Sequence, residues 1–141
     1  VEMIEKKHRI EDALEAVKSA QEEGIVPGGG ITLLRVANKL DDLCSSLEMS
    51  EELKFAKGIF ESALVAPIHT IASNAGLKWE NLESLVSDSE CNSGYNFLTD
   101  EVVDMFDVGI IDPCKVTKSA LKNAVSAAGT LLTTDHAIVE V

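Results

Sequence analysis

Residues 10–32 read IEDALEAVKSAQEEGIVPGGGIT, and much of the architecture can be anticipated from them. Between residues 10 and 17 the apolar side chains recur at positions i, i+3, i+4 and i+7, which is the spacing of one helix face. Gly24 follows as a residue that ends a helix in the left-handed backbone conformation. The glycines at 28–30 then precede a second helical pattern. We therefore expect a long first helix, a glycine loop and a second helix.

Helical patterns continue through the middle of the chain. Residues 33–43 predict the second helix, and Ser50 is placed to cap a third one, with two glutamates in its first turn. The third pattern runs on past Pro67, where a kink or a break is expected because proline lacks the backbone N–H. Residues 74–76 (NAG) are a helix stop, and residues 77–86 predict one more short helix.

The last third of the chain mixes both kinds of element. Residues 95–99 (YNFLT) predict a short strand, and residues 99–106 predict a brief helix. Asp112 followed by proline is a start signal, with aspartate as the N-cap and proline at the first helical position. A long helix of small residues is expected over 116–131. Residues 132–141 are rich in β-branched side chains and predict a strand. The fold class is therefore mostly α, a helical bundle with a few short strands.

Composition narrows the function classes. The chain has 141 residues, 45% of them hydrophobic, and a net charge of −12. Such an acidic balance argues against nucleic acid and anionic membranes as partners, because both require a basic surface. The sequence shows no membrane-spanning run and no signal peptide, and three widely spaced cysteines suit a reducing compartment. Because the chain opens with Val1 directly in a helical pattern, we expect it to be a piece of a longer protein.

Four positions carry alternative interpretations. The glycine loop around Gly29 either approaches a phosphate with its backbone or is a turn that lets two helices pack closely. Asp112 is either a site residue or a helix N-cap, and Asp12 is either functional or a solvated acid in mid-helix. Asn96 is either a ligand contact or a turn residue. Pattern alone does not separate these alternatives.

Other side chains that often carry chemistry have simpler interpretations. The three histidines are too widely spaced for a metal site, and no base accompanies the cysteines. Trp79, Leu82 and Leu85 form either a satellite apolar cluster or a contact face. A free-standing enzyme that binds phosphate lacks a nucleophile–base pair.

Four blocks of the sequence, in order, resemble the group I chaperonins, the class of GroEL. They are RIEDALEAVKSAQEEGIVPGGGITLLRVANKL (9–40), APIHTIASNAG (66–76), SGYNFLTDE (93–101) and GIIDPCKVTKSALKNAVSAAGTLLTTDHAIVEV (109–141). The resemblance covers essentially the whole chain and corresponds to the C-terminal part of a chaperonin subunit.

The resemblance implies a domain assignment and a set of partners. Residues 1–23 correspond to a helix of the intermediate domain, and residues 24–141 to the C-terminal half of the equatorial, ATP-binding domain. Full-length members form homo-oligomeric rings that refold non-native proteins with a co-chaperonin. Their cofactors are ATP and Mg²⁺.

The resemblance also assigns site residues. Asp12 corresponds to the aspartate that aligns the attacking water on ATP, and Gly29 to a glycine that contacts the nucleotide. Asn96 corresponds to a residue near the adenine, and Asp112 to the aspartate on the ribose side. These positions are expected to meet in one pocket, with Gly29, Asn96 and Asp112 along one side of it.

This chain departs from the family pattern in two places. Phe97 and Leu98 follow Asn96 where the family has small residues, so contacts to the adenine at these two positions are expected to differ. His69 and Lys78 differ from the basic and acidic residues usual in the inter-ring region of bacterial members.

The DGTTT motif of the family, which belongs to its phosphate- and magnesium-binding part, does not occur in this sequence. We therefore expect the full-length protein to be an ATPase and this chain alone to be inactive. The expected location is the bacterial cytoplasm, with the mitochondrial matrix or the plastid stroma as the alternative. The competing interpretation of the whole chain is an acidic helical scaffold module that binds no nucleotide.

Overall fold

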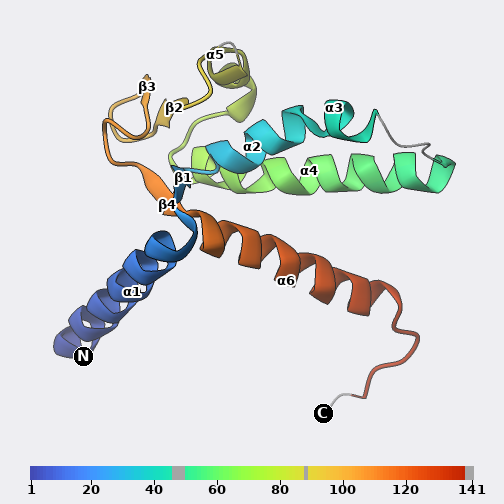
Figure 1. Cartoon of the computed structure of the whole chain (residues 1–141), viewed down its shortest axis with the longest axis horizontal. Helices are drawn as coiled ribbons and strands as arrows, with labels where there is room; N and C mark the ends of the chain where they lie inside the picture. The colour runs from blue at the N-terminus through green and yellow to red at the C-terminus, as the bar shows by residue number, and fades with distance from the viewer. Residues whose placement is uncertain (46–49, 88, 139–141) are drawn as a thin grey trace. The chain divides into compact units, whose positions relative to one another are not determined.

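The computed structural model describes residues 1–45, 50–87 and 89–138, and it is mostly helical with short strands, as expected from the sequence (Figure 1). The chain divides into two compact units. We call residues 26–111 the core unit, and residues 1–25 together with 112–141 the terminal unit. This division follows spatial contacts, so the predicted domain bounds of the full-length subunit, 1–23 and 24–141, stay a prediction.

Two long helices make up most of the terminal unit. Helix α1 spans Glu2–Glu23 and helix α6 spans Cys114–Leu132. Gly24 ends α1, as predicted, although its φ of 82° and ψ of −170° are not those of the left-handed helical conformation. That combination is available almost only to glycine.

Polar contacts join the end of α1 to the start of α6. The N–H of Cys114 donates to the carbonyl of Gly24 at 3.0 Å. Lys118 forms an ion pair with Glu23 at 2.7 Å, and Lys115 forms one with Glu22. The hydrogen bond that Lys118 donates to Glu23 raises the pKa of Lys118, and the one that Lys115 donates to Glu22 raises the pKa of Lys115. Ion pairs and a backbone hydrogen bond thus join these two helix ends.

The core unit holds the remaining helices. They are α2 (Ile31–Asn38), α3 (Leu40–Cys44), α4 (Glu51–Asn74), the 3₁₀ helix η1 (Trp79–Asn81) and α5 (Glu83–Ser87). Ser50 caps α4 as predicted, since its hydroxyl accepts from the N–H of Leu53 at 3.4 Å. The helix passes through Pro67 without ending, so the expectation of a break is wrong. Leu64 and Ile68, both buried, hold the helix against its neighbours on either side of the proline.

The apolar core lies among α2, α4, η1 and α5, and α2 runs beside α4 (Figure 1). Its buried members are Ile31, Leu34, Ile68, Ala72, Trp79, Leu82, Val86, Tyr95 and Met105. Trp79 and Leu82 thus belong to the main core rather than to a satellite cluster, whereas the side chain of Leu85 is exposed.

Four short strands form two small sheets. Strands β2 (Ser93–Asn96) and β3 (Glu101–Asp104) are antiparallel, with Gly94 opposite Val103 and Tyr95 opposite Val102. Strands β1 (Ile25–Pro27) and β4 (Ile111–Pro113) are neighbours in the second sheet. Both sheets contain two strands among the described residues.

Several expectations from local pattern are wrong. The brief helix over 99–106 is strand β3, because its residues pair with β2 instead of coiling. Asp112 is not a helix N-cap, since it lies within β4 and Pro113 takes the cap position. The helix expected over 33–43 is interrupted at Lys39, and the one expected over 77–86 is divided into η1 and α5. The described part of the tail contains no strand up to residue 138, and residues 139–141 lie outside the described residues.

Candidate functional site

The glycine loop of the core unit begins with a close approach of two backbones. The N–H of Gly28 donates to the carbonyl of Ile110 at 2.9 Å. A methyl group at position 28 would lie 3.2 Å from the carbonyl carbon and oxygen of Ile110. On the other side of the loop, the hydroxyl of Thr32 donates to the carbonyl of Pro27 at 2.7 Å. The loop therefore requires a small residue at position 28, and these two hydrogen bonds hold its backbone in place.

Gly29 and Gly30 have the positive φ angles that glycine tolerates best, 64° and 81°. A methyl group at Gly30 would lie 3.0 Å from the Cβ and N atoms of Ile68 in α4. The turn interpretation is therefore confirmed for Gly30, because this glycine lets the start of α2 reach α4. Gly29 is half-buried at the same turn, directly before α2. Contact between Gly29 and a nucleotide stays a prediction.

Asn96 ends β2 and organises the turn that follows. Its side-chain oxygen accepts from the N–H of Leu98 at 3.0 Å, which makes an Asx turn. Its backbone carbonyl accepts from the N–H of Asp100 at 2.9 Å, and Asp100 has a φ of 56°. Asn96 is therefore a turn residue, which agrees with one of the two interpretations of its sequence position. Its side-chain NH₂ group takes no part in the bond to Leu98 and stays a donor.

The two residues after Asn96 differ in their surroundings. Phe97 is half-buried, packs on the core and meets Tyr95 edge-on, with 5.2 Å between ring centroids. Leu98 is 92% exposed. Burial, together with the neighbouring Asp100 carboxylate, raises the pKa of Tyr95. At the end of β2, Phe97 is thus a structural anchor, whereas Leu98 is available to a ligand.

Met105 connects the glycine loop with strand β2. Its terminal methyl carbon lies 3.3 Å from where a methyl group at Gly29 would be. Its sulfur lies 2.9 Å from the corresponding point at Gly94, two residues before Asn96. Ile31, the first residue of α2, also packs against Gly94. The structure therefore brings the loop and the strand that carries Asn96 against one buried side chain.

The two candidate aspartates belong to the terminal unit. Asp12 lies in the middle of α1 and is exposed. It stands eleven residues before Glu23, which places it about 16 Å along the helix from that residue. Asp112 lies in β4, where partial burial raises the pKa of its carboxyl group. The expected meeting of both aspartates with Gly29 and Asn96 stays a prediction.

Arg35 is a structural anchor that sequence patterns did not indicate. From α2, its guanidinium donates to the carbonyls of Val86 and Glu90 and to the hydroxyl of Ser89, each at 2.9 Å. Val86 lies in the last turn of α5, and Ser89 and Glu90 follow the helix, a region where carbonyl groups need donors. The one available signal is that Arg35 is the single charged residue of α2. Arg35 fixes the segment that leads into β2.

The described residues contain no cluster of three or more metal-ligating side chains. Nor is any helix in the described part of the chain long and apolar enough to cross a membrane.

The family of the chain follows from a comparison with models of known protein families. The model of the TCP-1/cpn60 chaperonin family matches residues 1–141. The chain belongs to this family. Among solved structures, the chaperonin chain is similar to one described as the crystal structure of a group III chaperonin in the open state. The two share 30% sequence identity with a TM-score of 0.74. The match covers 85% of the chaperonin chain and 25% of that structure's chain.

These comparisons test the interpretations of the whole sequence. The resemblance to chaperonins is confirmed at the level of the family, and the alternative of an unrelated scaffold module is not favoured. The helical fold with short strands is that of the matched part of a chaperonin.

Proposed function

We propose that the chain is the C-terminal part of a group I chaperonin subunit and supplies one side of its ATP pocket. The observation that carries this proposal is the agreement of four sequence blocks, in family order, with a family match over residues 1–141. Residues 1–23 form an intermediate-domain helix in this proposal, and residues 24–141 form half of the equatorial domain. The full-length protein is an ATP-driven chaperone for non-native proteins.

Each candidate residue has one role in the proposed pocket. Gly29 offers its backbone to the nucleotide, and Asn96 offers the NH₂ group that its turn leaves unused, a donor suited to a purine nitrogen. Phe97 anchors the turn, while the exposed Leu98 covers the base. Asp112 binds on the ribose side.

Asp12 aligns the attacking water in the proposed mechanism. Asp12 is exposed in mid-helix, where the oxygens of its carboxylate can accept a hydrogen bond from water. The rest of the subunit provides the groups that hold phosphate and Mg²⁺. The purified chain of residues 1–141 alone accordingly hydrolyses no ATP above background.

The remaining partners follow from the same proposal. The subunit assembles with copies of itself into a ring and works with a co-chaperonin. As a group I member it acts in the bacterial cytoplasm or, in a eukaryote, in the mitochondrial matrix or plastid stroma.

The decisive experiment uses the full-length subunit. Asp12→Ala is expected to slow ATP hydrolysis by about 10²–10⁴-fold, the usual contribution of a group that handles the reacting proton or water, while nucleotide binding is retained. Glu11→Ala removes the same charge one residue away and is expected to leave turnover unchanged. Turnover of Asp12→Ala within twofold of the wild type would exclude Asp12 from the site.

A further inference from the structure

Met105 is a buried residue of the core unit that packs against both the glycine loop and strand β2. It follows strand β3 directly and has no exposed surface. Its terminal methyl carbon lies 3.3 Å from the point that a Cβ atom at Gly29 would occupy, and its sulfur lies 2.9 Å from the corresponding point at Gly94. Apart from the chain neighbours of Gly29, the one other described residue within 4 Å of that first point is Ile110, at 3.9 Å. Met105 is therefore the nearest support of the loop at Gly29.

Backbone hydrogen bonds hold Met105 between the same two segments. Its N–H donates to the carbonyl of Asn92 at 3.0 Å, directly before β2. The N–H of Ile110 donates to the carbonyl of Met105 at 2.8 Å, and the N–H of Gly28 donates to the carbonyl of Ile110 at 2.9 Å. One side chain and one short series of hydrogen bonds thus link the glycine loop to the start of β2.

The turn after β3 restricts the backbone around Met105. The carboxylate of Asp104 accepts from the N–H of Phe106 at 2.8 Å and from the N–H of Asp107 at 3.1 Å. The backbone is therefore hydrogen-bonded on both sides of Met105, and the side chain is enclosed. Met105 has little freedom to move relative to the loop or to the strand.

These contacts reach the two segments that the proposed pocket assigns to the nucleotide. Gly94 and Asn96 are two residues apart in β2, so they lie on the same face of the strand. Gly29 stands at the turn directly before α2. Because a close-packed interior transmits strain, a change at Met105 reaches both segments.

We propose that Met105 is a positioning residue of the nucleotide pocket. It holds Asn96 at a set position relative to the glycine loop, so that the NH₂ group of Asn96 meets the base while the backbone of Gly29 meets the nucleotide. This inference rests on the proposed nucleotide pocket and extends it to a buried residue that touches no ligand.

The test is a double-mutant cycle that measures ATP binding by the full-length subunit. Met105→Leu keeps a similar apolar volume but withdraws the sulfur and the terminal methyl carbon from the two glycines. It is expected to weaken ATP binding by about tenfold, the size of one misplaced hydrogen bond. Asn96→Asp keeps an oxygen that accepts from the N–H of Leu98 and removes the NH₂ donor. Once this donor is absent, adding Met105→Leu is expected to weaken binding further by less than about twofold.

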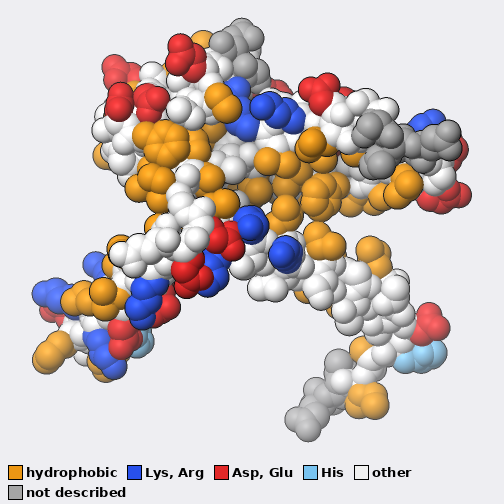
Figure 2. Space-filling view, viewed as in Figure 1, with side chains coloured by type: hydrophobic (Ala, Val, Ile, Leu, Met, Phe, Trp, Pro, Cys, Tyr) orange, Lys and Arg blue, Asp and Glu red, His pale blue; other side chains and the backbone are white. Residues whose placement is uncertain are grey.

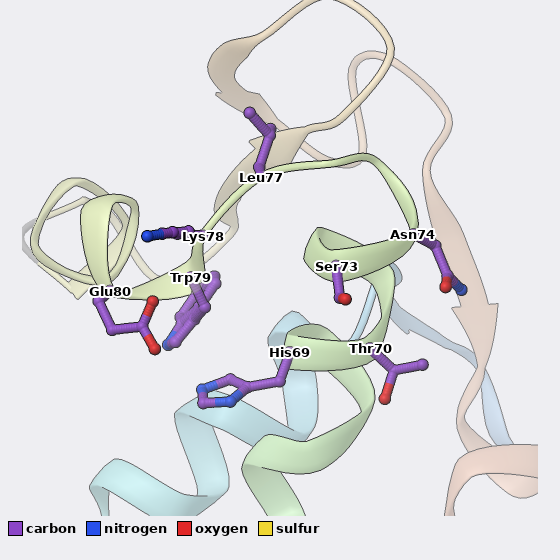
Figure 3. A pocket seen from close by; sticks show the side chains of 8 residues that line it. All are labelled: His69, Thr70, Ser73, Asn74, Leu77, Lys78, Trp79 and Glu80. Carbon is purple, nitrogen blue, oxygen red and sulfur yellow. The ribbon is translucent and has the colours of Figure 1, made fainter.

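The control for a general loosening of the core is Trp79→Phe. Trp79 is a buried member of the same apolar core, but Figure 3 shows it beside His69, where η1 meets the last turns of α4. The hollow of about 450 Å³ at this place is lined by none of the residues assigned to the nucleotide. This conservative change is expected to alter ATP binding by less than about twofold.

Three outcomes would overturn the inference. They are ATP binding by Met105→Leu equal to that of the wild type, an equal loss with and without Asn96→Asp, and an equal loss with Trp79→Phe. In each of these cases the nucleotide proposal stands, provided that the wild-type subunit binds ATP and Asn96→Asp weakens this binding. A wild-type subunit that binds no ATP would instead contradict the nucleotide proposal itself, and the inference with it.

Discussion

The core unit and the terminal unit are built on different physical principles. Every buried apolar residue among the described positions belongs to residues 26–111, whereas the described residues of α1 and α6 include no buried one. Both helices nevertheless carry large apolar side chains, such as Leu14 and Val125, that are more than half exposed. Residues 26–111 therefore contain their own apolar core. Helices α1 and α6 instead expose apolar side chains that another protein segment could cover.

Exposed apolar groups are not confined to the terminal unit. On the face shown in Figure 2, hydrophobic side chains gather over α4 as well. Two large apolar residues in the first half of α4, Phe55 and Ile59, are exposed, and Phe55 is 74% exposed. The two units therefore differ in their buried apolar residues, whereas both of them have exposed apolar residues.

The largest expected effect comes from one substitution made in both units. Leu34→Ala removes a fully buried side chain from α2 and is expected to reduce the free energy of unfolding by about 2–5 kcal/mol. Leu14→Ala makes the same change at an exposed position of α1 and is expected to change it by less than about 0.5 kcal/mol. Urea unfolding followed by Trp79 fluorescence measures both. Equal losses would break the comparison, because Leu14 would then be covered in solution.

A glycine pair sharpens the comparison further. A methyl group at Gly94 would lie 2.5 Å from Ile31 Cγ1, so Gly94→Ala is expected to destabilise the core unit by about 1–3 kcal/mol. At Gly129 in α6 a methyl group would meet no atom within 4 Å. Gly129→Ala is therefore expected to stabilise α6 by up to about 1 kcal/mol, since alanine favours helix. Thermal unfolding monitored by circular dichroism tests both signs.

The full-length subunit provides the control for the second substitution. If Gly129→Ala destabilises the full-length subunit but stabilises the chain of residues 1–141, this face of α6 is covered by other residues of the full-length subunit. A loss in both settings would contradict the open surroundings of Gly129.

The smallest effect concerns the ion pairs between α1 and α6. Salt shortens the range of exposed charge interactions from about 30 Å at 0.01 M to about 3 Å at 1 M. The amide of Cys114, bonded to the carbonyl of Gly24, is therefore expected to lose protection from hydrogen exchange as salt rises. The amide of Leu34, bonded to the carbonyl of Gly30 in the core unit, serves as the internal control. Equal loss at both amides would contradict an electrostatic junction.

The same junction has a defined pH dependence. The pKa values of Lys115 and Lys118 are raised by their glutamate partners, so their contribution is present below the ordinary lysine pKa and is lost as pH rises through the raised values. The pKa of Glu23 is lowered by Lys118, so its contribution is present above the ordinary glutamate pKa and is lost as pH falls through the lowered value. Protection of Cys114, corrected for the intrinsic exchange rate, is expected to be highest between these two limits.

Sequence patterns predicted the elements whose determinants are local. The end of α1 at Gly24, the Ser50 cap and the extent of α6 depend on neighbouring residues, and each was predicted to within a few positions. Strand β3 was mistaken for a helix, because its identity depends on pairing with β2 rather than on its own periodicity. Asp112 was misplaced for a similar reason, since β4 pairs with a strand far away in sequence.

The candidate site shows the same limit. The glycine loop was found from composition, yet the requirement for Gly30 comes from Ile68, a residue of another helix. The contact of Met105 with both the loop and β2 has no local signature, nor have the carbonyls that bind Arg35. The family assignment came from motif order, which carries information that periodicity does not.

The terminal unit combines the two ends of the chain, and this sets an order of events during synthesis. The ribosome completes residues 26–111 before any of α6 exists. At roughly 5–20 residues per second, residues 112–141 take about 1.5–6 s to make. Helix α1 is thus complete before α6 exists, and throughout that interval its exposed apolar side chains, such as Leu14, lack the helix that α1 contacts in the terminal unit.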